Sequence, residues 1–347
     1  MKKIDFAIFR GLNTSGGGKV PEVPYLDLTK QEEPLKFLFT LNGRGMIAED
    51  NIHTIMGLQK TGKSAVGIAL MAAALRGEFL GIRANEEKTP VLWIDTEQDT
   101  QTLRERALAM LKIAGYESGA PETLNIVTLR AAVLGDRLSI ISQAIRDKGP
   151  KLVFIDGAVD LCEDFNDNTK SLHVVEELLR LCEVYHCTIL TVIHTNKKEE
   201  VARGHLGAFL QQKSGEVYLL RKVMDIATVT QSESRFAPVS PFAFQFGDNF
   251  TIEPVESAES PLRDLFLEIF ENDFDKKIRS GDLCQILQER KGFGSRSAMN
   301  MMAAAVKALI LDKEKISQNK AYYQLNQNAG RDFGPACTQD EEDDDVL

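Results

Sequence analysis

The sequence predicts an α/β fold in which helices flank a mostly parallel sheet, with a small C-terminal domain of winged-helix type. From Ile52 to about Ile252, apolar strand-like runs alternate with helical runs, the pattern of a parallel sheet covered on both faces. A glycine-containing loop joins the first of these strands to the first helix. After a polar linker, three helical stripes and a hairpin pattern follow. We therefore expect two folded domains.

Composition divides the chain into five segments. Three consecutive glycines at 16–18 and two nearby prolines indicate an extended N-terminal arm over residues 1–30. We expect the α/β domain at 31–253, a linker at 254–260, a winged helix-turn-helix-like domain at 261–326 and an acidic tail at 327–347.

The first strand and helix of the α/β domain enclose a phosphate-binding motif. Residues 57–64 fit G-x-x-x-x-G-K-[ST], with a β-rich run before them and an apolar helical run after them, as this motif requires. Its glycines let backbone N–H groups converge on phosphate oxygens, and the following helix aims its positive dipole end at the same anion. Lys63 can reach the β- and γ-phosphates of a nucleotide, and the Ser64 hydroxyl can bind Mg²⁺. The residues expected to bind the nucleotide are Gly57, Leu58, Gln59, Lys60, Thr61, Gly62, Lys63, Ser64 and Ala65.

The later elements follow from apolar runs and stripes. Strands are expected at 90–95, 124–129, 152–156 and 188–193, and again at 217–220, 226–230 and 242–246. One helix should bury Leu103, Ala107, Met110 and Leu111, and another Leu172, Val175, Leu178, Leu179 and Cys182.

The C-terminal domain shows three helical stripes and a hairpin, the outline of a winged helix-turn-helix. The stripes are Leu262, Leu265, Phe266, Ile269 and Phe270, then Leu283, Ile286 and Leu287, then Met299, Met302, Val306, Leu309 and Ile310; the hairpin spans 313–325. Residues 276–325 carry ten Lys or Arg against four Asp or Glu, which favours binding of duplex DNA. The alternative is a protein-binding winged helix, because residues 299–305 are too apolar to face a DNA groove entirely.

Overall charge and cysteine usage narrow the function classes. The formal net charge of −10 excludes a uniformly basic nucleic-acid coat, and six carboxylates cluster at 340–345. These carboxylates are either a disordered solubility tail or a segment that covers basic DNA-binding surfaces. Five cysteines without C-x-x-C spacing indicate neither a disulfide framework nor a zinc site. With no membrane-length apolar run and no signal-peptide core, we expect a cytoplasmic protein without a membrane partner.

Three polar residues at strand ends are candidates for chemistry. Asp156 ends an apolar strand and would hold Mg²⁺ opposite Ser64; alternatively it caps the next loop. Glu97 follows the strand at 90–95, which we expect beside the P-loop strand, and could deprotonate a water that attacks the γ-phosphate. Its alternative role is a solvated carboxylate at a helix start. His194 could contact the γ-phosphate, or it could be a satisfied core histidine.

In their order, these motifs resemble the RecA-like ATPases. The P-loop is followed by Asp95-Thr96-Glu97, by 152–156 ending in aspartate, and by Val-Ile-His-Thr-Asn-Lys at 192–197 with Ala-Arg-Gly at 202–204. Within that group, residues 40–250 look most like the RepA-type hexameric helicases and related AAA family ATPases of plasmids and other mobile elements.

The resemblance implies ATP and Mg²⁺ as ligands, Glu97 as the catalytic glutamate and His194 as the γ-phosphate sensor. It also implies a homo-oligomeric ring or filament, with loops at 158–170 and 195–204 facing single-stranded DNA in a central channel. A basic residue of the neighbouring subunit would complete each site. Lys213 falls near the position of that residue, and Arg203 is the second candidate. The RepA-type group normally has arginine at this position, so a lysine would depart from its pattern. The expected function is a DNA helicase or DNA-remodelling ATPase; the alternatives are a slowly hydrolysing, ATP-switched DNA-binding regulator and an ATPase with a protein client.

Overall fold

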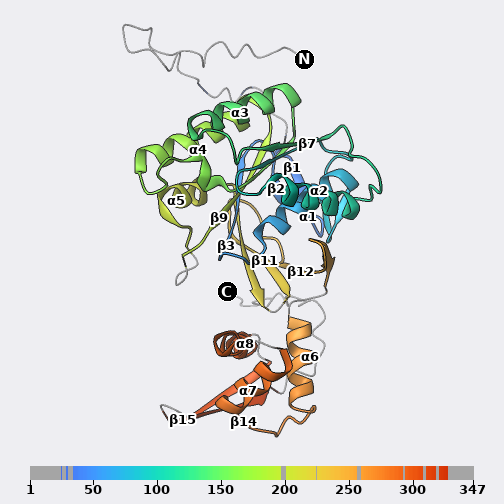
Figure 1. Cartoon of the computed structure of the whole chain (residues 1–347), viewed down its shortest axis with the longest axis vertical. Helices are drawn as coiled ribbons and strands as arrows, with labels where there is room; N and C mark the ends of the chain where they lie inside the picture. The colour runs from blue at the N-terminus through green and yellow to red at the C-terminus, as the bar shows by residue number, and fades with distance from the viewer. Residues whose placement is uncertain are drawn as a thin grey trace, which may run out of the picture. The chain divides into compact units, whose positions relative to one another are not determined.

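The computed structural model describes residues 25, 29, 34–196, 201–223, 225–255, 259–291, 294–307, 310–317 and 320–326. Nearly all of the expected N-terminal arm and the whole acidic tail lie outside these residues, as do Lys197 and Lys198 of the expected DNA-binding loop. The chain divides into two compact units, one formed by Met1–Lys222 with Ala227–Pro254, the other by Val223–Ile226 with Val255–Leu347 (Figure 1). Among the described helices, none is both long and apolar enough to cross a membrane.

The larger unit contains the following elements. Its helices are α1 (Lys63–Arg76), α2 (Thr100–Ile113), α3 (Leu134–Lys148), the short 3₁₀ helix η2 (Ala158–Leu161), α4 (Asn168–Tyr185) and α5 (Gly204–Lys213). Its strands are β1 (Phe37–Leu41), β2 (Arg44–Ala48), β3 (Ile52–Gly57), β4 (Glu78–Phe79), β5 (Ile82–Ala84), β6 (Val91–Asp95), β7 (Leu124–Thr128), β8 (Leu152–Asp156), β9 (Thr188–His194), β10 (Glu216–Val223), β11 (Ile226–Ser234), β12 (Phe242–Phe246) and β13 (Ile252–Pro254).

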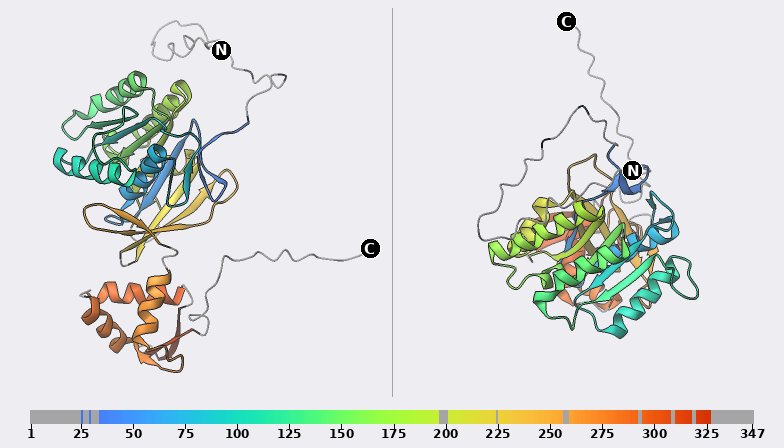
Figure 2. Two further views of the ribbon diagram at one scale, coloured as in Figure 1. Left: turned by 90° about the vertical axis from the view of Figure 1, so that its right-hand side faces the viewer. Right: turned by 90° about the horizontal axis from the view of Figure 1, so that it is seen from above.

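A mostly parallel sheet forms the centre of this unit, which confirms the predicted α/β class. Its strands lie in the order β13-β12-β11-β10-β3-β9-β8-β6-β7, and the six from β10 to β7 run parallel. Alternate side chains of each strand enter different cores. Trp93 packs on the side of α1 and α2, whereas Leu92 and Ile94 pack on the side of α3, α4 and α5. Both faces of the sheet are therefore covered by helices (Figures 1 and 2).

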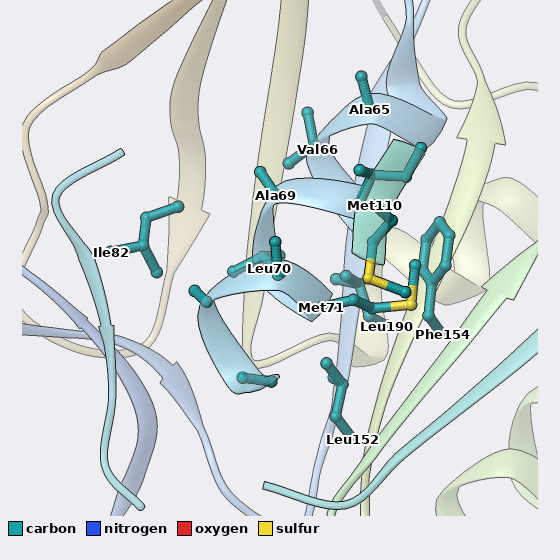
Figure 3. Close-up of a cluster of buried hydrophobic side chains, with 14 of the residues drawn as sticks. Ala65, Val66, Ala69, Leu70, Met71, Ile82, Met110, Leu152, Phe154 and Leu190 are labelled. Atoms are coloured by element: carbon teal, nitrogen blue, oxygen red, sulfur yellow. The ribbon is translucent and has the colours of Figure 1, made fainter. Parts of the chain in front are cut away.

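The helix that follows the P-loop is buried on almost every side. Its alanines, such as Ala69 and Ala73, are fully buried, because the separate sheet β2-β1-β5-β4 covers the side of α1 away from the central sheet. Figure 3 shows Met71 of this helix beside Met110 of α2 and Phe154 of β8. A Cβ at Gly67 would lie only 2.1 Å from Cζ of Phe154, so the close approach of helix and sheet requires glycine there.

One predicted neighbour relation is wrong. Strand β6, which leads to Glu97, does not lie beside the P-loop strand β3, because β9 and β8 are inserted between them. In a parallel sheet, the strand after a crossover helix can join the sheet on either side of the strand before it. The order of strands along the sequence therefore does not fix their order in the sheet. Three elements were also not predicted: the four-stranded antiparallel sheet, α3 and α5.

The smaller unit contains α6 (Glu259–Ile269), β14 (Ile278–Arg279), α7 (Ser280–Lys291), α8 (Ser295–Lys307), β15 (Leu311–Ser317) and β16 (Lys320–Leu325). Its strands form an antiparallel sheet in the order β14-β16-β15. The three predicted helices and the hairpin are present, while the winged-helix class itself stays a prediction.

The predicted buried stripe of the third C-terminal helix is confirmed at Met302 and Ile310 and wrong at Met299. Met299 was expected in the core, but its side chain is 54% exposed. The residues that pack inward are Ala298, Met301, Met302 and Ala305. Small alanines fill the space against α7 and β15, a role that a pattern of large apolar residues does not reveal.

Candidate active site

The P-loop connects the carboxyl end of β3 to the start of α1, and steric constraints fix both of its glycines. A Cβ on Gly57 would lie 2.7 Å from the carbonyl oxygen of Leu220. Gly62 has φ +93°, and a Cβ there would lie 2.2 Å from Cζ of Phe246. Any larger residue would displace the neighbouring backbone or ring, so this loop keeps the narrow path that a phosphate cradle needs.

Lys63 lies buried inside this loop. Its ammonium group donates a hydrogen bond of 2.7 Å to the carbonyl oxygen of Leu58. Burial lowers the pKa of Lys63 to about 8, and the nearby carboxylates of Asp156 and Glu97 act in the opposite direction. The lysine is thus held at the point where the two carboxylates converge.

Asp156 at the end of β8 lies next to the P-loop serine. Burial raises the pKa of Asp156, and the nearby Ser64 hydroxyl acts in the opposite direction. Oδ2 of Asp156 is buried without a hydrogen-bond partner among the described residues, since Nη1 of Arg106 is 3.8 Å away. A buried, unsatisfied carboxylate oxygen beside a hydroxyl is an oxygen donor set that suits Mg²⁺.

These two side chains fit Mg²⁺ only together with a nucleotide. Among the described residues, no group of three or more His, Cys, Asp or Glu side chains could hold a metal by itself. Mg²⁺ is commonly bound by one or two carboxylates together with substrate phosphates and water. Ser64 and Asp156 supply two oxygen ligands of such a set, and phosphate and water oxygens would have to supply the others.

Glu97 is brought to the site by the contact between the ends of β6 and β8. The neighbouring Thr96 is buried, and its Oγ1 lies 3.2 Å from the carbonyl oxygen of Asp156 and 3.0 Å from that of Gly157. Gly157 has φ +98°, and a Cβ there would lie 2.9 Å from Cγ of Glu97. Burial raises the pKa of Glu97, and the carboxylates of Asp156, Asp160 and Asp95 add to the effect. Glu97 is therefore a partly buried carboxylate with a raised pKa, next to the P-loop lysine.

The structure adds Asp95 and Arg106, which sequence reasoning missed. Oδ1 of Asp95 accepts hydrogen bonds from the backbone N–H groups of Glu97, at 3.0 Å, and Gln98, at 2.7 Å, and so fixes the turn that carries Glu97. The positive charge of Arg106 acts on both Asp95 and Asp156, and its guanidinium lies 5.2 Å from the ring centre of Phe250. An arginine at the edge of the apolar stripe of α2 was the only available sequence signal.

His194 lies directly beside the start of the P-loop. It pairs with Gly57 in the parallel register of β3 and β9, and the N–H of Thr195 donates to the carbonyl oxygen of Gly57 at 3.0 Å. Burial lowers the pKa of His194, helped by the charges of Lys63 and Arg203. The imidazole is therefore neutral at neutral pH and can serve as a hydrogen-bonding group.

The two candidates for a shared basic residue lie in different places. Arg203 stacks on the ring of Phe165 in its own chain, with 5.3 Å from the guanidinium carbon to the ring centre. Its N–H donates to the carbonyl oxygen of His194 at 2.9 Å. Lys213 is exposed at the end of α5, two residues before Gly215, whose N–H donates to Ile52 at the start of β3. Lys213 therefore lies at the end of the sheet opposite the P-loop.

The fold gathers five of the predicted site residues at the carboxyl ends of β3, β6, β8 and β9, where α/β sheets bind their ligands: Lys63, Ser64, Glu97, Asp156 and His194. It leaves Lys213 away from this cluster. Of the predicted loop residues, Leu58, Gln59 and Lys60 are exposed at the turn of the P-loop, whereas Thr61 turns back and donates from Oγ1 to the carbonyl oxygen of Leu58 at 2.8 Å.

Comparison with protein-family models gives one match, to the family described as AAA domain, over residues 22–200. No curated protein matches the chain. The matched segment is more than half of the chain and contains the P-loop, Glu97, Asp156 and His194. The chain therefore belongs to the AAA domain family of P-loop ATPases.

Proposed function

We propose that this chain hydrolyses ATP with Mg²⁺ and couples hydrolysis to DNA in a ring or filament, as a RepA-type helicase or DNA-remodelling ATPase of a mobile element. ATP hydrolysis is supported by one observation above all: Glu97, Asp156 and Lys63 lie close enough at the P-loop for their charges to act on one another. A phosphate cradle alone would bind a nucleotide, but a buried carboxylate beside it can also activate water.

Each residue of the site has a distinct task. Lys63 compensates charge on the β- and γ-phosphates, while Ser64 and Asp156 hold Mg²⁺. When bound there, Mg²⁺ would neutralise negative charge that develops on the phosphates. Glu97 orients a water and accepts its proton, for which its raised pKa is suited. Neutral His194 donates a hydrogen bond towards the γ-phosphate and loses that contact after hydrolysis.

The geometry behind His194 supports coupling to DNA. Thr195 pairs with Ala202 in an antiparallel bridge, and the N–H of Asn196 donates to the carbonyl oxygen of Val201 at 2.8 Å. The chain is therefore paired on both sides of residues 197–200, directly after His194, and these four residues lie outside the described ones. Their sequence contains Lys197 and Lys198 and no aromatic residue, a composition that suits phosphate contacts to single-stranded DNA without base stacking.

A second contact joins this loop to the one after β8. The guanidinium of Arg203 lies over the ring of Phe165. The carbonyl oxygen of Phe165 accepts a hydrogen bond of 3.1 Å from the N–H of Leu206. Both proposed DNA-contacting loops would therefore move together when His194 changes its contact. Because Arg203 is engaged within its own chain, we assign the shared basic residue to Lys213, which is exposed and distant from its own P-loop.

ATP turnover with and without single-stranded DNA tests the proposal, on protein whose mass in solution is known. The proposal expects an oligomer, measurable turnover, and stimulation by DNA that weakens as salt rises. Turnover that is unaffected by DNA would refute the DNA coupling, and a monomer at full activity would refute a shared site.

A second candidate is an ATP-switched regulator that binds duplex DNA and has no helicase activity. It is favoured by the C-terminal unit, in which three helices, a two-stranded hairpin and a short third strand follow the order of a winged helix. A strand-displacement assay separates this candidate from the helicase form of the first one, because only a helicase unwinds a duplex in the presence of ATP.

A further inference from the structure

Helix α8 of the smaller unit has one buried and one exposed face. Ala298, Met301, Met302 and Ala305 pack against the rest of the unit. Arg296, Asn300 and Ala303 are exposed, and their spacing of four and three residues places them along one line on the opposite face.

The exposed line has the chemistry of a groove-reading helix. An arginine fork matches the O6 and N7 acceptors of guanine, and an asparagine amide matches N7 and the N6 amino group of adenine. Ala303 is small, so it allows the helix backbone to approach a surface closely. No acidic residue occurs between 295 and 307, whereas the exposed positions of the neighbouring α7 include Asp282 and Glu289. Of these two helices, α8 is the one whose described exposed face carries no negative charge that would repel a polyanion.

The hairpin that packs against α8 carries its basic and its acidic side chains on opposite faces of β15. Lys313 and Lys315 are exposed and share the strand face of buried Leu311, because side chains alternate along β15. The acids project from the opposite face and already have partners. Glu314 accepts from Nζ of Lys277 at 2.7 Å, and Asp312 accepts from Nδ2 of Asn326 at 2.9 Å. The hairpin thus places its lysines on the side of the sheet that carries the helices.

We propose that α8 enters the major groove of duplex DNA and reads sequence through Arg296 and Asn300, while Lys313 and Lys315 contact phosphates. The major groove, about 12 Å wide, admits an α-helix, and base edges there distinguish all four base pairs. The partner is therefore a duplex with a preferred sequence that contains a guanine and an adenine at neighbouring positions. This inference deepens the DNA-binding part of the proposed function and rests on it.

Selection from a random duplex library with the full chain tests the inference. We expect an enriched motif, and Asn300→Ala should weaken binding to that motif by about 5- to 150-fold while leaving binding to a scrambled duplex unchanged. Arg296→Lys keeps the charge but loses the fork, so it should relax preference at the guanine. Lys315→Ala should weaken both duplexes equally and reduce the salt dependence of binding by about one phosphate contact.

Gln285→Ala is the matched control, because Gln285 is an exposed amide on α7, outside the proposed surface. The inference is overturned if no motif is enriched, if no duplex is bound at low salt, or if Asn300→Ala and Gln285→Ala behave alike. ATP turnover measured on the same preparations separates the two proposals. If the protein hydrolyses ATP but enriches no duplex motif, this inference alone is wrong. If it enriches a motif but does not hydrolyse ATP, the ATPase proposal is wrong and the inference about α8 is retained.

Discussion

Replacing Gly157 by alanine tests how Glu97 is held in the site. Gly157 adopts φ +98° and ψ +46°, in the left-handed region. An L-residue pays about 1–2 kcal/mol for such a conformation. The added Cβ would also lie 2.1 Å from Oγ1 of Thr96 and 2.9 Å from Cγ of Glu97. Contacts this short force one of the groups to move.

Thr96 cannot move without losing its own contacts. Its Oγ1 lies 3.0 Å from the carbonyl oxygen of Gly157 and 2.9 Å from Oδ2 of Asp160, and the hydroxyl donates to one of its acceptors at a time. The contact of 2.1 Å can be relieved only by moving Thr96 or residue 157 itself, and either shift displaces the adjoining Glu97, which the new methyl group also touches. A misplacement of about 1 Å can cost about 10²-fold in rate. We expect Gly157→Ala to keep ATP affinity, because Lys63 and Ser64 are untouched, and to lose about 10²-fold in turnover.

Gly149→Ala provides the control. Gly149 ends α3 with φ +55° and ψ +48°, and a Cβ there would meet nothing within 4 Å. Gly149→Ala places alanine in the same left-handed conformation but brings its Cβ against no other group. The variant should therefore lower the free energy of unfolding by about 1–2 kcal/mol and leave ATP turnover normal. The assays are steady-state ATP turnover and nucleotide binding. Equal turnover in the two variants would refute the claim that Gly157 positions Glu97.

The remaining predictions concern charge and assembly. Lys63→Ala should abolish nucleotide binding measured by calorimetry, since it removes the only buried cation of the P-loop among the described residues, and unchanged affinity would contradict the site. Because the pKa of Lys63 is about 8 without nucleotide and phosphates favour its charged form, ATP affinity should be constant below pH 8 and fall above it by about tenfold per pH unit, with one proton taken up on binding. A flat profile up to pH 10 would show that Lys63 is charged throughout. Lys213→Ala should bind ATP yet lose about 10³–10⁵-fold in turnover, and mixing it with Lys63→Ala should restore part of the activity if the site is shared between subunits. Mixed oligomers that form without recovery would exclude this role for Lys213.

The P-loop could be predicted because its chemistry is local. The positions of Gly57, Gly62, Lys63 and Ser64 follow from the short loop itself, and the apolar runs around it set strand and helix. The carboxyl ends of parallel strands lie at one edge, so Asp156 and His194 could be placed near the loop from sequence.

The rest of the site depends on long-range packing. The order of β3, β9, β8 and β6 is set by crossovers, so the position of Glu97 relative to the P-loop strand was predicted wrongly. Arg106 reaches Asp156 from a helix of another crossover, and Gly157 matters because Thr96 and Glu97 approach it from β6. No local pattern encodes these contacts.

Helix α5 shows the same limit for secondary structure. It begins with Gly204 and contains Gly207, and glycine disfavours helices. Burial of Leu206 and Leu210 stabilises the helix, and a Cβ on Gly207 would lie 2.9 Å from Cδ1 of Ile193. Tertiary packing against β9 therefore overrides the local preference.

The most direct test of the account is Glu97→Gln, because the substitution keeps the size of the side chain and removes the base. ATP and Mg²⁺ should still bind through Lys63, Ser64 and Asp156, with affinity close to wild type in calorimetry. Single-turnover hydrolysis should fall by about 10²–10⁴-fold, the usual cost of losing a general base. Near-normal hydrolysis with normal binding would contradict the assignment of Glu97 as the residue that activates water.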